Sequence, residues 1–184
     1  MTIVEAIKQI LRRDPNARVL ACAPSNSAAD VITLRLSELL KADELFRFYA
    51  PSREKGLVPP DLLPFTFEND GGVFSHPPLD TVKNFRVIVS TCISAAFAHG
   101  IGVERGHFSH VFIDEAGQAT ESEAMVVVKT TAIASTKLIL SGDPEQLRPI
   151  IQSVIANELG LSVSYLERLM KCETYNGSND GSSG

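Results

Sequence analysis

The stretch that decides the fold is residues 110–118, HVFIDEAGQ, in which a short apolar run ends in two adjacent carboxylates. The pattern recurs in residues 137–149, KLILSGDPEQLRP, where an apolar run again leads into a polar turn. Short, continuous apolar runs are typical of strands that are buried on both faces. Both stretches therefore predict strands of a parallel sheet, each followed by polar residues at its carboxyl end.

Two further apolar runs, residues 18–23 and 85–91, extend this pattern, and polar residues close both of them. Helical periodicity and N-cap residues predict helices over 2–13, 28–40 and 122–129, a short helix or turn over 93–98, and helical segments near 154–158 and 162–171. Strands that alternate with helices indicate an α/β fold with a parallel sheet covered on both faces. Ligands of such sheets bind beyond the carboxyl ends of the strands, so we expect the four polar motifs along one rim.

The bulk composition limits the classes of protein to consider. The chain has 184 residues, which fits one domain, and its net charge of −5 excludes a histone-like basic binder but leaves a local RNA groove open. The three cysteines lie far apart, and His99, His107 and His110 lack the spacing of metal ligands, so we expect neither a disulfide framework nor a zinc site. The sequence shows neither a signal peptide nor an apolar run long enough to span a bilayer, which predicts a cytoplasmic protein.

The middle and the end of the chain differ from this regular pattern. Residues 41–84 are rich in proline and aromatic residues and are predicted to form an irregular insertion within a domain over 1–171. The FRFY run at 46–49 is compatible with a stacking platform for bases or with a small satellite core, and we favour the core. Residues 176–184 consist of Asn, Gly, Ser and Asp, so 172–184 is predicted to be a disordered tail.

The two carboxylates at 114 and 115 suit two different roles. Asp114 can hold Mg²⁺ through water, and Glu115 can accept a proton from an attacking water. Such a pair also occurs by chance on solvated loops.

In the second stretch, Gln146 has a neutral side chain that can both donate and accept hydrogen bonds, so it can sense a γ-phosphate and contact the attacking water. The alternative for this turn is an ordinary helix start with Asp143 as the N-cap and Pro144 behind it, and both interpretations can hold. The two stretches together indicate nucleotide hydrolysis.

The polar residues after the other two strands suit phosphate groups. Residues 24–27, PSNS, end one strand and open a helix, where hydroxyls, an amide and free backbone N–H groups can bind the phosphate of a nucleic acid. An ordinary N-cap explains this motif equally well. Thr91 and its neighbour Ser90 give a weaker signal, for which simple packing is favoured. Cys22 and Cys92 are most simply buried small hydrophobic side chains.

Residues 1–171 resemble the first RecA-like domain of a superfamily 1 helicase, in the Upf1-like branch that includes RNA helicases of the Armitage/Moloney-leukaemia-virus-ten type. The resemblance rests on APSNSAAD at 23–30 (motif Ia), VSTC at 89–92, DEAGQ at 114–118 (motif II, the Walker B element) and SGDPEQLRP at 141–149 (motif III). It implies a P-loop NTPase fold and ATP-driven 5′-to-3′ movement on single-stranded RNA, with proteins of RNA silencing or RNA decay as partners.

The resemblance also assigns roles to residues. It implies Glu115 and Gln146 as catalytic residues and Asp114 as the residue that holds Mg²⁺ through water. The ATP–Mg²⁺ side of the site comprises Asp114, Gly142, Asp143 and Gln146, and the RNA side comprises Pro24, Ser25, Asn26, Ser27 and Thr91.

The sequence departs from the family pattern in one important respect. It contains no G-x-x-x-x-G-K-[ST] loop, which in the family would end directly before Met1, and no second RecA-like domain. We therefore expect an N-terminally truncated helicase fragment that is inactive alone and whose sheet lacks an inner strand, leaving buried backbone groups of its neighbours unpaired. The alternatives are a non-catalytic RNA- or protein-binding module and a non-functional truncated product.

Overall fold

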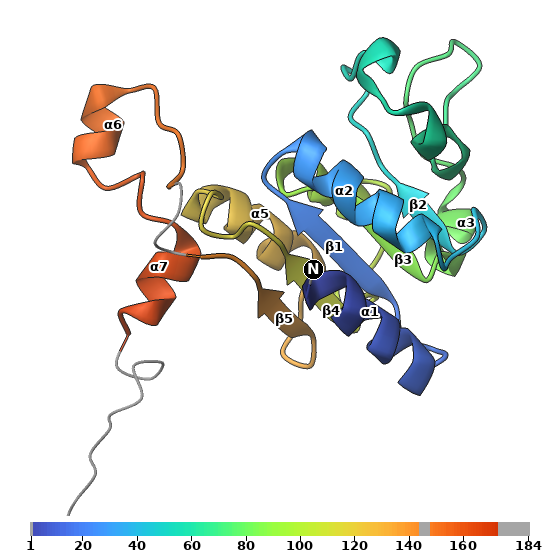
Figure 1. The fold of residues 1–184 in the computed structure, drawn as a ribbon, viewed down its shortest axis with the longest axis horizontal. Coiled ribbons are helices and arrows are strands. Elements are labelled where there is room, and N and C mark those ends of the chain that lie inside the picture. Colours follow the sequence, from blue (N-terminus) through green and yellow to red (C-terminus); the bar gives the residue numbers. More distant parts are fainter. Residues whose placement is uncertain (1, 144–147, 173–184) are drawn as a thin grey trace, which may run out of the picture.

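The computed structural model describes residues 2–143 and 148–172 and contains one sheet of five parallel strands in the order β2-β3-β1-β4-β5 (Figure 1). The strands are β1 (Val19–Ala23), β2 (Leu45–Arg47), β3 (Val87–Thr91), β4 (His110–Ile113) and β5 (Lys137–Leu140). The register places Ala23 beside Thr91, and Ile113 beside both Cys22 and Leu140. The predicted α/β fold with a parallel sheet is confirmed, and the carboxyl ends of all strands lie on one edge.

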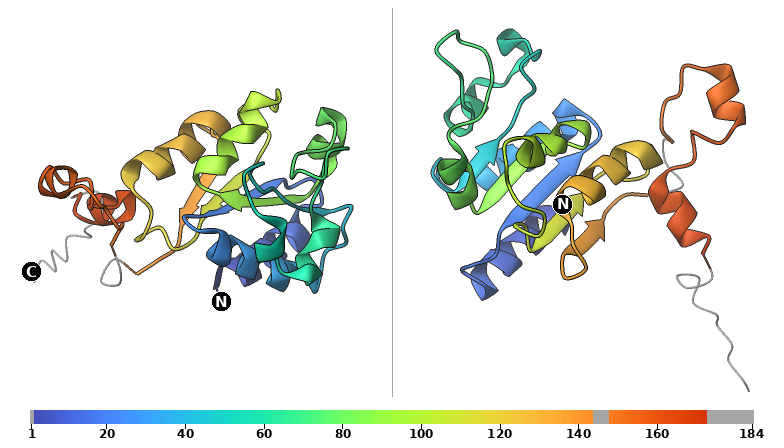
Figure 2. Two further views of the ribbon diagram at one scale, coloured as in Figure 1. Left: turned by 90° about the horizontal axis from the view of Figure 1, so that it is seen from above. Right: turned by 180° about the vertical axis from the view of Figure 1, so that it is seen from behind.

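Helices cover both faces of this sheet, and Figure 2 shows the strands between them. The helices α1 (Thr2–Arg13) and α2 (Asn26–Ser37) pack on one face, where Ile7 and Ile32 join a buried cluster with Val19. The other face is covered by the 3₁₀ turn η3 (Ile93–Ala96) and the helices α3 (Leu79–Asn84), α4 (Phe97–Gly100) and α5 (Glu121–Thr131). On that face, Leu20 and Val127 belong to a second buried cluster. Alternate side chains of β1 enter the two clusters, as expected for a strand buried on both faces.

Segment 41–84 contains a strand that the sequence pattern did not predict. Its first part forms β2, which pairs with β3 and places Phe46 and Phe48 in the main core. The FRFY run is therefore not an exposed stacking platform, because all four of its side chains are buried. Tyr49 joins a small separate core with Val58, Phe74 and Leu62 of the 3₁₀ turn η2 (Pro60–Phe65), so the satellite-core interpretation is correct for this residue.

The ladder of strands is continuous across the described residues. β1 pairs with β3 on one side and β4 on the other, so the expected vacancy at an inner position is wrong for these strands. The edges are β2 and β5, and β5 is an apolar strand whose last three side chains are only partly buried. An open edge leaves backbone groups to solvent, which avoids the desolvation cost that an inner vacancy would carry.

The C-terminal helices lie near their predicted positions, α6 over Val154–Glu158 and α7 over Tyr165–Met170. Arg168 of α7 pairs with Glu121 at the start of α5, with 2.6 Å between Nη2 and Oε1. No helix in the described ranges 2–143 and 148–172 combines the length and the apolar character that crossing a membrane requires. The predicted tail at 172–184 lies outside the described residues except for Cys172.

Candidate functional site

The loops that follow the inner strands are joined by backbone hydrogen bonds at the carboxyl edge of the sheet. The amide of Asp114 donates to the carbonyl of Cys22 at 2.8 Å, and the amide of Cys92 donates to the carbonyl of Ala23 at 2.9 Å. The amide of Ser141 donates to the carbonyl of Ile113 at 2.9 Å. The ladder thus continues one residue beyond each strand, and the residues at 24–27, 91, 114–115 and 141–143 start from one rim, as the sequence predicted.

Glu115 occupies a backbone conformation that few residues other than glycine adopt. Its φ is +51°, in the left-handed region, which costs a residue with a Cβ on the order of 1–3 kcal/mol. Two hydrogen bonds from Gln118 stabilise the turn, one from its amide to the Glu115 carbonyl at 2.8 Å and one from Nε2 to Oε2 at 3.0 Å. The carboxylate of Glu115 is therefore oriented by Gln118 while it stays partly exposed to solvent.

Gly142 brings the loop after β5 into contact with the loop after β4. A Cβ at this position would lie 2.9 Å from the backbone nitrogen of Ala116 and 3.0 Å from that of Gly117, so glycine is required. The amide of Ala116 also donates to the carbonyl of Ser141 at 2.8 Å. Asp114 and Asp143 thus lie on adjoining loops, whereas Gln146 lies outside the described residues.

The described residues fit a magnesium ion held mainly by water. They contain no group of three or more His, Cys, Asp or Glu side chains that could enclose a metal ion. Mg²⁺ retains several water ligands and is commonly bound through one or two carboxylates and substrate phosphates, so it needs no such cage. The partly exposed carboxylate of Asp114 at the rim is an oxygen ligand of the required kind.

The turn at 24–27 is a helix N-cap with exposed hydroxyls. Ser25 has extended backbone angles, and its Oγ accepts a hydrogen bond from the amide of Ala28 at 3.1 Å at the start of α2. The Oγ atoms of Ser25 and Ser27 are 3.0 Å apart, and both side chains are exposed. Thr91 accepts a hydrogen bond from the amide of Ser94 at 3.3 Å. The N-cap interpretation is confirmed, and the exposed hydroxyls leave the phosphate-binding role open.

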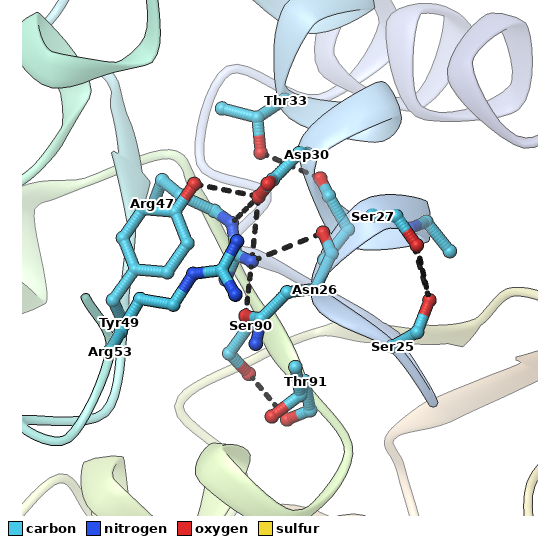
Figure 3. Close-up of polar contacts among 12 residues, drawn as sticks. Ser25, Asn26, Ser27, Asp30, Thr33, Arg47, Tyr49, Arg53, Ser90 and Thr91 are labelled. Carbon is cyan, nitrogen blue, oxygen red and sulfur yellow. Dashed lines mark hydrogen bonds and ion pairs between the residues drawn. The ribbon is translucent and has the colours of Figure 1, made fainter. Parts of the chain in front are cut away.

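A buried ion pair fixes this turn to strand β2 (Figure 3). Arg47 is fully buried, and its Nε and Nη2 donate to Oδ1 of Asp30 at 2.9 Å and 2.8 Å. Nη1 donates to the carbonyl of Phe48 at 2.7 Å, and Nη2 also donates to Oδ1 of Asn26 at 2.9 Å. The hydroxyl of Tyr49 donates to the same Asp30 oxygen at 2.7 Å, and its ring lies 4.0 Å from the Arg47 guanidinium carbon.

Sequence reasoning assigned Asn26 to the site but missed Arg47 and Asp30. The available signal was one arginine flanked by two phenylalanines, a pattern that implies a charged side chain inside a core and therefore a buried partner. Burial is also the main cause that raises the pKa of the Tyr49 hydroxyl above its usual value, so this group is a neutral donor to Asp30 at physiological pH.

The two cysteines near the rim are buried, as predicted. Burial raises the pKa of the Cys22 thiol to about 12 and also raises that of Cys92. The Sγ of Cys22 lies 3.8 Å from the Oγ of Ser90, and both cysteines are free thiols. Both are therefore protonated near neutral pH and act as small apolar side chains.

Comparison with known proteins adds a family to this geometry. A family model described as an AAA domain matches residues 1–69 and 79–154. The RNA helicase Mov10l1 of Homo sapiens is 40% identical over 177 residues, which cover 95% of this chain and 14% of that protein. The probable RNA helicase armi of Drosophila melanogaster is 35% identical over 193 residues, which cover 95% of this chain and 16% of that protein. The chain therefore spans less than a fifth of these two relatives.

Among solved structures, the Pyrococcus furiosus Hef helicase domain aligns with a TM-score of 0.49 at 14% identity, over 79% of this chain and 26% of that chain. The family model covers well over half of the chain and includes the residues at 24–27, 114–118 and 141–149. The chain belongs to this AAA-domain family and, within it, to the Upf1-like branch of superfamily 1 helicases.

Proposed function

We propose that residues 1–171 form part of the first RecA-like domain of an ATP-dependent RNA helicase and carry one side of its nucleotide site and part of its RNA path. The observation that carries the proposal is the packing of Gly142 against the backbone of Ala116 and Gly117, which joins the two loops expected to handle the nucleotide. The turn at 24–27 lies on the same edge of the sheet. Relatives that are named RNA helicases support RNA as the substrate.

In the proposed mechanism, Asp114 would hold Mg²⁺ through water, and the ion would supply positive charge that stabilises the transferred phosphate. Glu115 accepts the proton of the attacking water, and Gln118 holds its carboxylate in the required orientation. Gly142 and Asp143 form the adjoining wall of the site, and Gln146 senses the γ-phosphate. ATP binding, a cytoplasmic location and partners from RNA silencing or decay stay predictions from the family resemblance.

The proposed RNA path comprises Pro24, Ser25, Asn26, Ser27 and Thr91. These groups suit phosphates rather than base edges, so binding is expected to depend little on sequence. We expect the 184-residue chain to bind single-stranded RNA with micromolar or weaker affinity, on the order of non-specific binding at ~10⁻⁴–10⁻⁶ M, and to lose affinity as salt rises. Fluorescence anisotropy at two salt concentrations measures both properties.

Ser25→Asp should weaken this binding further, because it places a negative charge where a phosphate is expected. Aspartate is also a good N-cap residue, so the start of α2 should stay intact. Ser25→Asn is the matched control, since it keeps an N-cap and adds no charge. Tight binding that ignores salt and survives Ser25→Asp would place the RNA surface elsewhere and favour a non-catalytic binding module.

The 184-residue chain should not hydrolyse ATP at a helicase-like rate. Phosphoryl transfer depends on positioning and charge stabilisation, and these 184 residues contain no G-x-x-x-x-G-K-[ST] loop to bind the phosphates. Phosphate release is measured with and without single-stranded RNA. RNA-stimulated turnover near or above ~1 s⁻¹, as in ordinary phosphoryl-transfer enzymes, would show that the site has been misplaced.

A further inference from the structure

A groove of mixed polar and apolar lining lies beside the turn at 24–27, between α2 and residues 53–59. It has a volume of about 560 Å³ and is lined by Asn26, Ser27 and Val31 of α2 and by Arg53, Leu57 and Pro59 from the facing segment. This volume lies within the range of about 300–1,000 Å³ that is usual for small-molecule sites. The groove is continuous with the proposed RNA path because Asn26 and Ser27 belong to both.

The guanidinium of Arg53 is held at this groove without a carboxylate partner among the described residues. Its Nη2 donates to the carbonyl of Leu57 at 2.9 Å, whereas its Nε is buried and has no hydrogen-bond partner. Its central carbon lies 6.0 Å from the ring centre of Tyr49, whose ring also contacts Arg47 (Figure 3). Arg53 is therefore positioned in advance by packing and one hydrogen bond, and its Nη1 makes no hydrogen bond within the described residues.

The charge balance at the groove favours an anion. Asp30 is the carboxylate that lines it, and this group is already paired with the buried Arg47 and accepts a hydrogen bond from Tyr49. Arg47 is fully buried and does not line the groove, so Arg53 supplies the one positive charge that the lining residues do not already balance.

We propose that this groove binds a phosphodiester of single-stranded RNA, with Arg53 as the phosphate ligand and with the hydroxyl of Ser27 and the amide of Asn26 beside it. The inference rests on the proposed function and extends its RNA path from the 24–27 turn toward β2. Arginine suits this role because its planar fork of donors matches phosphate oxygens. Val31 and Leu57 are 45% and 58% exposed on the two walls, where they offer apolar contacts to a ribose or a base.

The test is a titration of a fluorescent single-stranded uridine oligonucleotide at several salt concentrations. Arg53→Gln should lower the affinity about three- to tenfold and should reduce the slope of log affinity against log salt by about 0.7, the loss of one contact to a single strand. Arg53→Lys should keep the slope and lose only part of the affinity, because it retains the charge but not the fork.

Arg13→Gln is the matched control, since it removes the same charge from an exposed position at the end of α1, outside the groove. It should change the affinity less than twofold. Val31→Glu compared with Val31→Gln provides a second test that does not alter Arg53. Val31→Glu should weaken RNA binding by about the same factor as Arg53→Gln, whereas Val31→Gln, which adds no charge, should not. These two variants decide the question if Arg53→Gln fails to fold.

The possible results separate this inference from the proposed function. In one result, Ser25→Asp weakens RNA binding, but Arg53→Gln and Val31→Glu leave the affinity and the salt slope unchanged. This result would reject RNA binding in the groove and leave the proposed function intact. No RNA binding by the unmodified chain would overturn both. A third result would assign the groove to a protein instead. In that case an acidic peptide displaces RNA from the chain, and Arg53→Gln weakens peptide binding more than it weakens RNA binding.

Discussion

Arg47→Met should lower the free energy of unfolding by about 3–5 kcal/mol, the usual cost of removing one partner from a buried ion pair. Methionine keeps much of the volume but removes both guanidinium bonds to Asp30, whose side chain is only 8% exposed. The carboxylate would then keep the hydroxyl of Tyr49 as its one remaining side-chain partner. Urea denaturation followed by circular dichroism measures the loss.

A double variant separates the lost ion pair from lost packing. Asp30→Leu combined with Arg47→Met should recover much of the stability, because neither partner is then left charged and buried. Lys55→Met is the exposed control, since the Lys55 side chain is 57% exposed and lies 2.8 Å from the carboxylate of Glu68. This variant should lower the free energy of unfolding by about 0–1 kcal/mol. A loss below ~1 kcal/mol for Arg47→Met would show that Asp30 is hydrated rather than buried.

Glu115→Gln should reduce ATP turnover by about 10²–10⁴-fold, the usual contribution of general acid–base catalysis. The reaction requires a complete nucleotide site, so residues 1–171 are joined to a phosphate-binding loop and a second RecA-like domain taken from an active helicase. Glutamine keeps the shape of the side chain but cannot accept the proton. RNA-stimulated phosphate release measures turnover, and a fluorescent ATP analogue measures binding, which should stay nearly unchanged.

Asp114→Ala provides the contrast in the same chimeric enzyme. It removes the proposed ligand of the Mg²⁺ water shell, so it should weaken the binding of Mg²⁺–ATP as well as turnover. If Glu115→Gln retains most of the turnover rate, another group is the proton acceptor. Equal losses of nucleotide binding in both variants would also contradict the separate roles of the two carboxylates.

The sequence was sufficient for the regular part of the fold. The bounds of β5 were predicted correctly, and β1, β3 and β4 were found within two residues, because continuous apolar runs are distinctive. β2 was missed because it has only three residues and contains Arg47, a side chain that is normally exposed. Its burial depends on Asp30, which lies 17 residues earlier, and no local pattern reveals such a pair.

The placement of the candidate loops at one edge of the sheet was predictable, whereas their detailed geometry was not. The rule that ligands bind at the carboxyl ends of strands located the loops at 24–27, 114–118 and 141–143. The left-handed turn at Glu115 and its hydrogen bonds to Gln118 depend on how the chain leaves β4, which composition does not reveal. The expected vacancy inside the sheet was wrong because the five described strands pair without a gap, and β5 is an edge of the sheet.

The burial of Cys22 and Cys92 has a consequence for the chemistry that can reach the centre of the sheet. Thiolates, not thiols, react with peroxides and alkylating agents, and burial keeps both groups protonated and shielded. Oxidative damage to this pair must therefore wait for the covering helices to move away from the sheet, because both cysteines belong to the buried cluster beneath η3, α4 and α5. The loops that begin at Pro24 and Thr91 thus rest on a part of the molecule that is resistant to oxidation while it is folded.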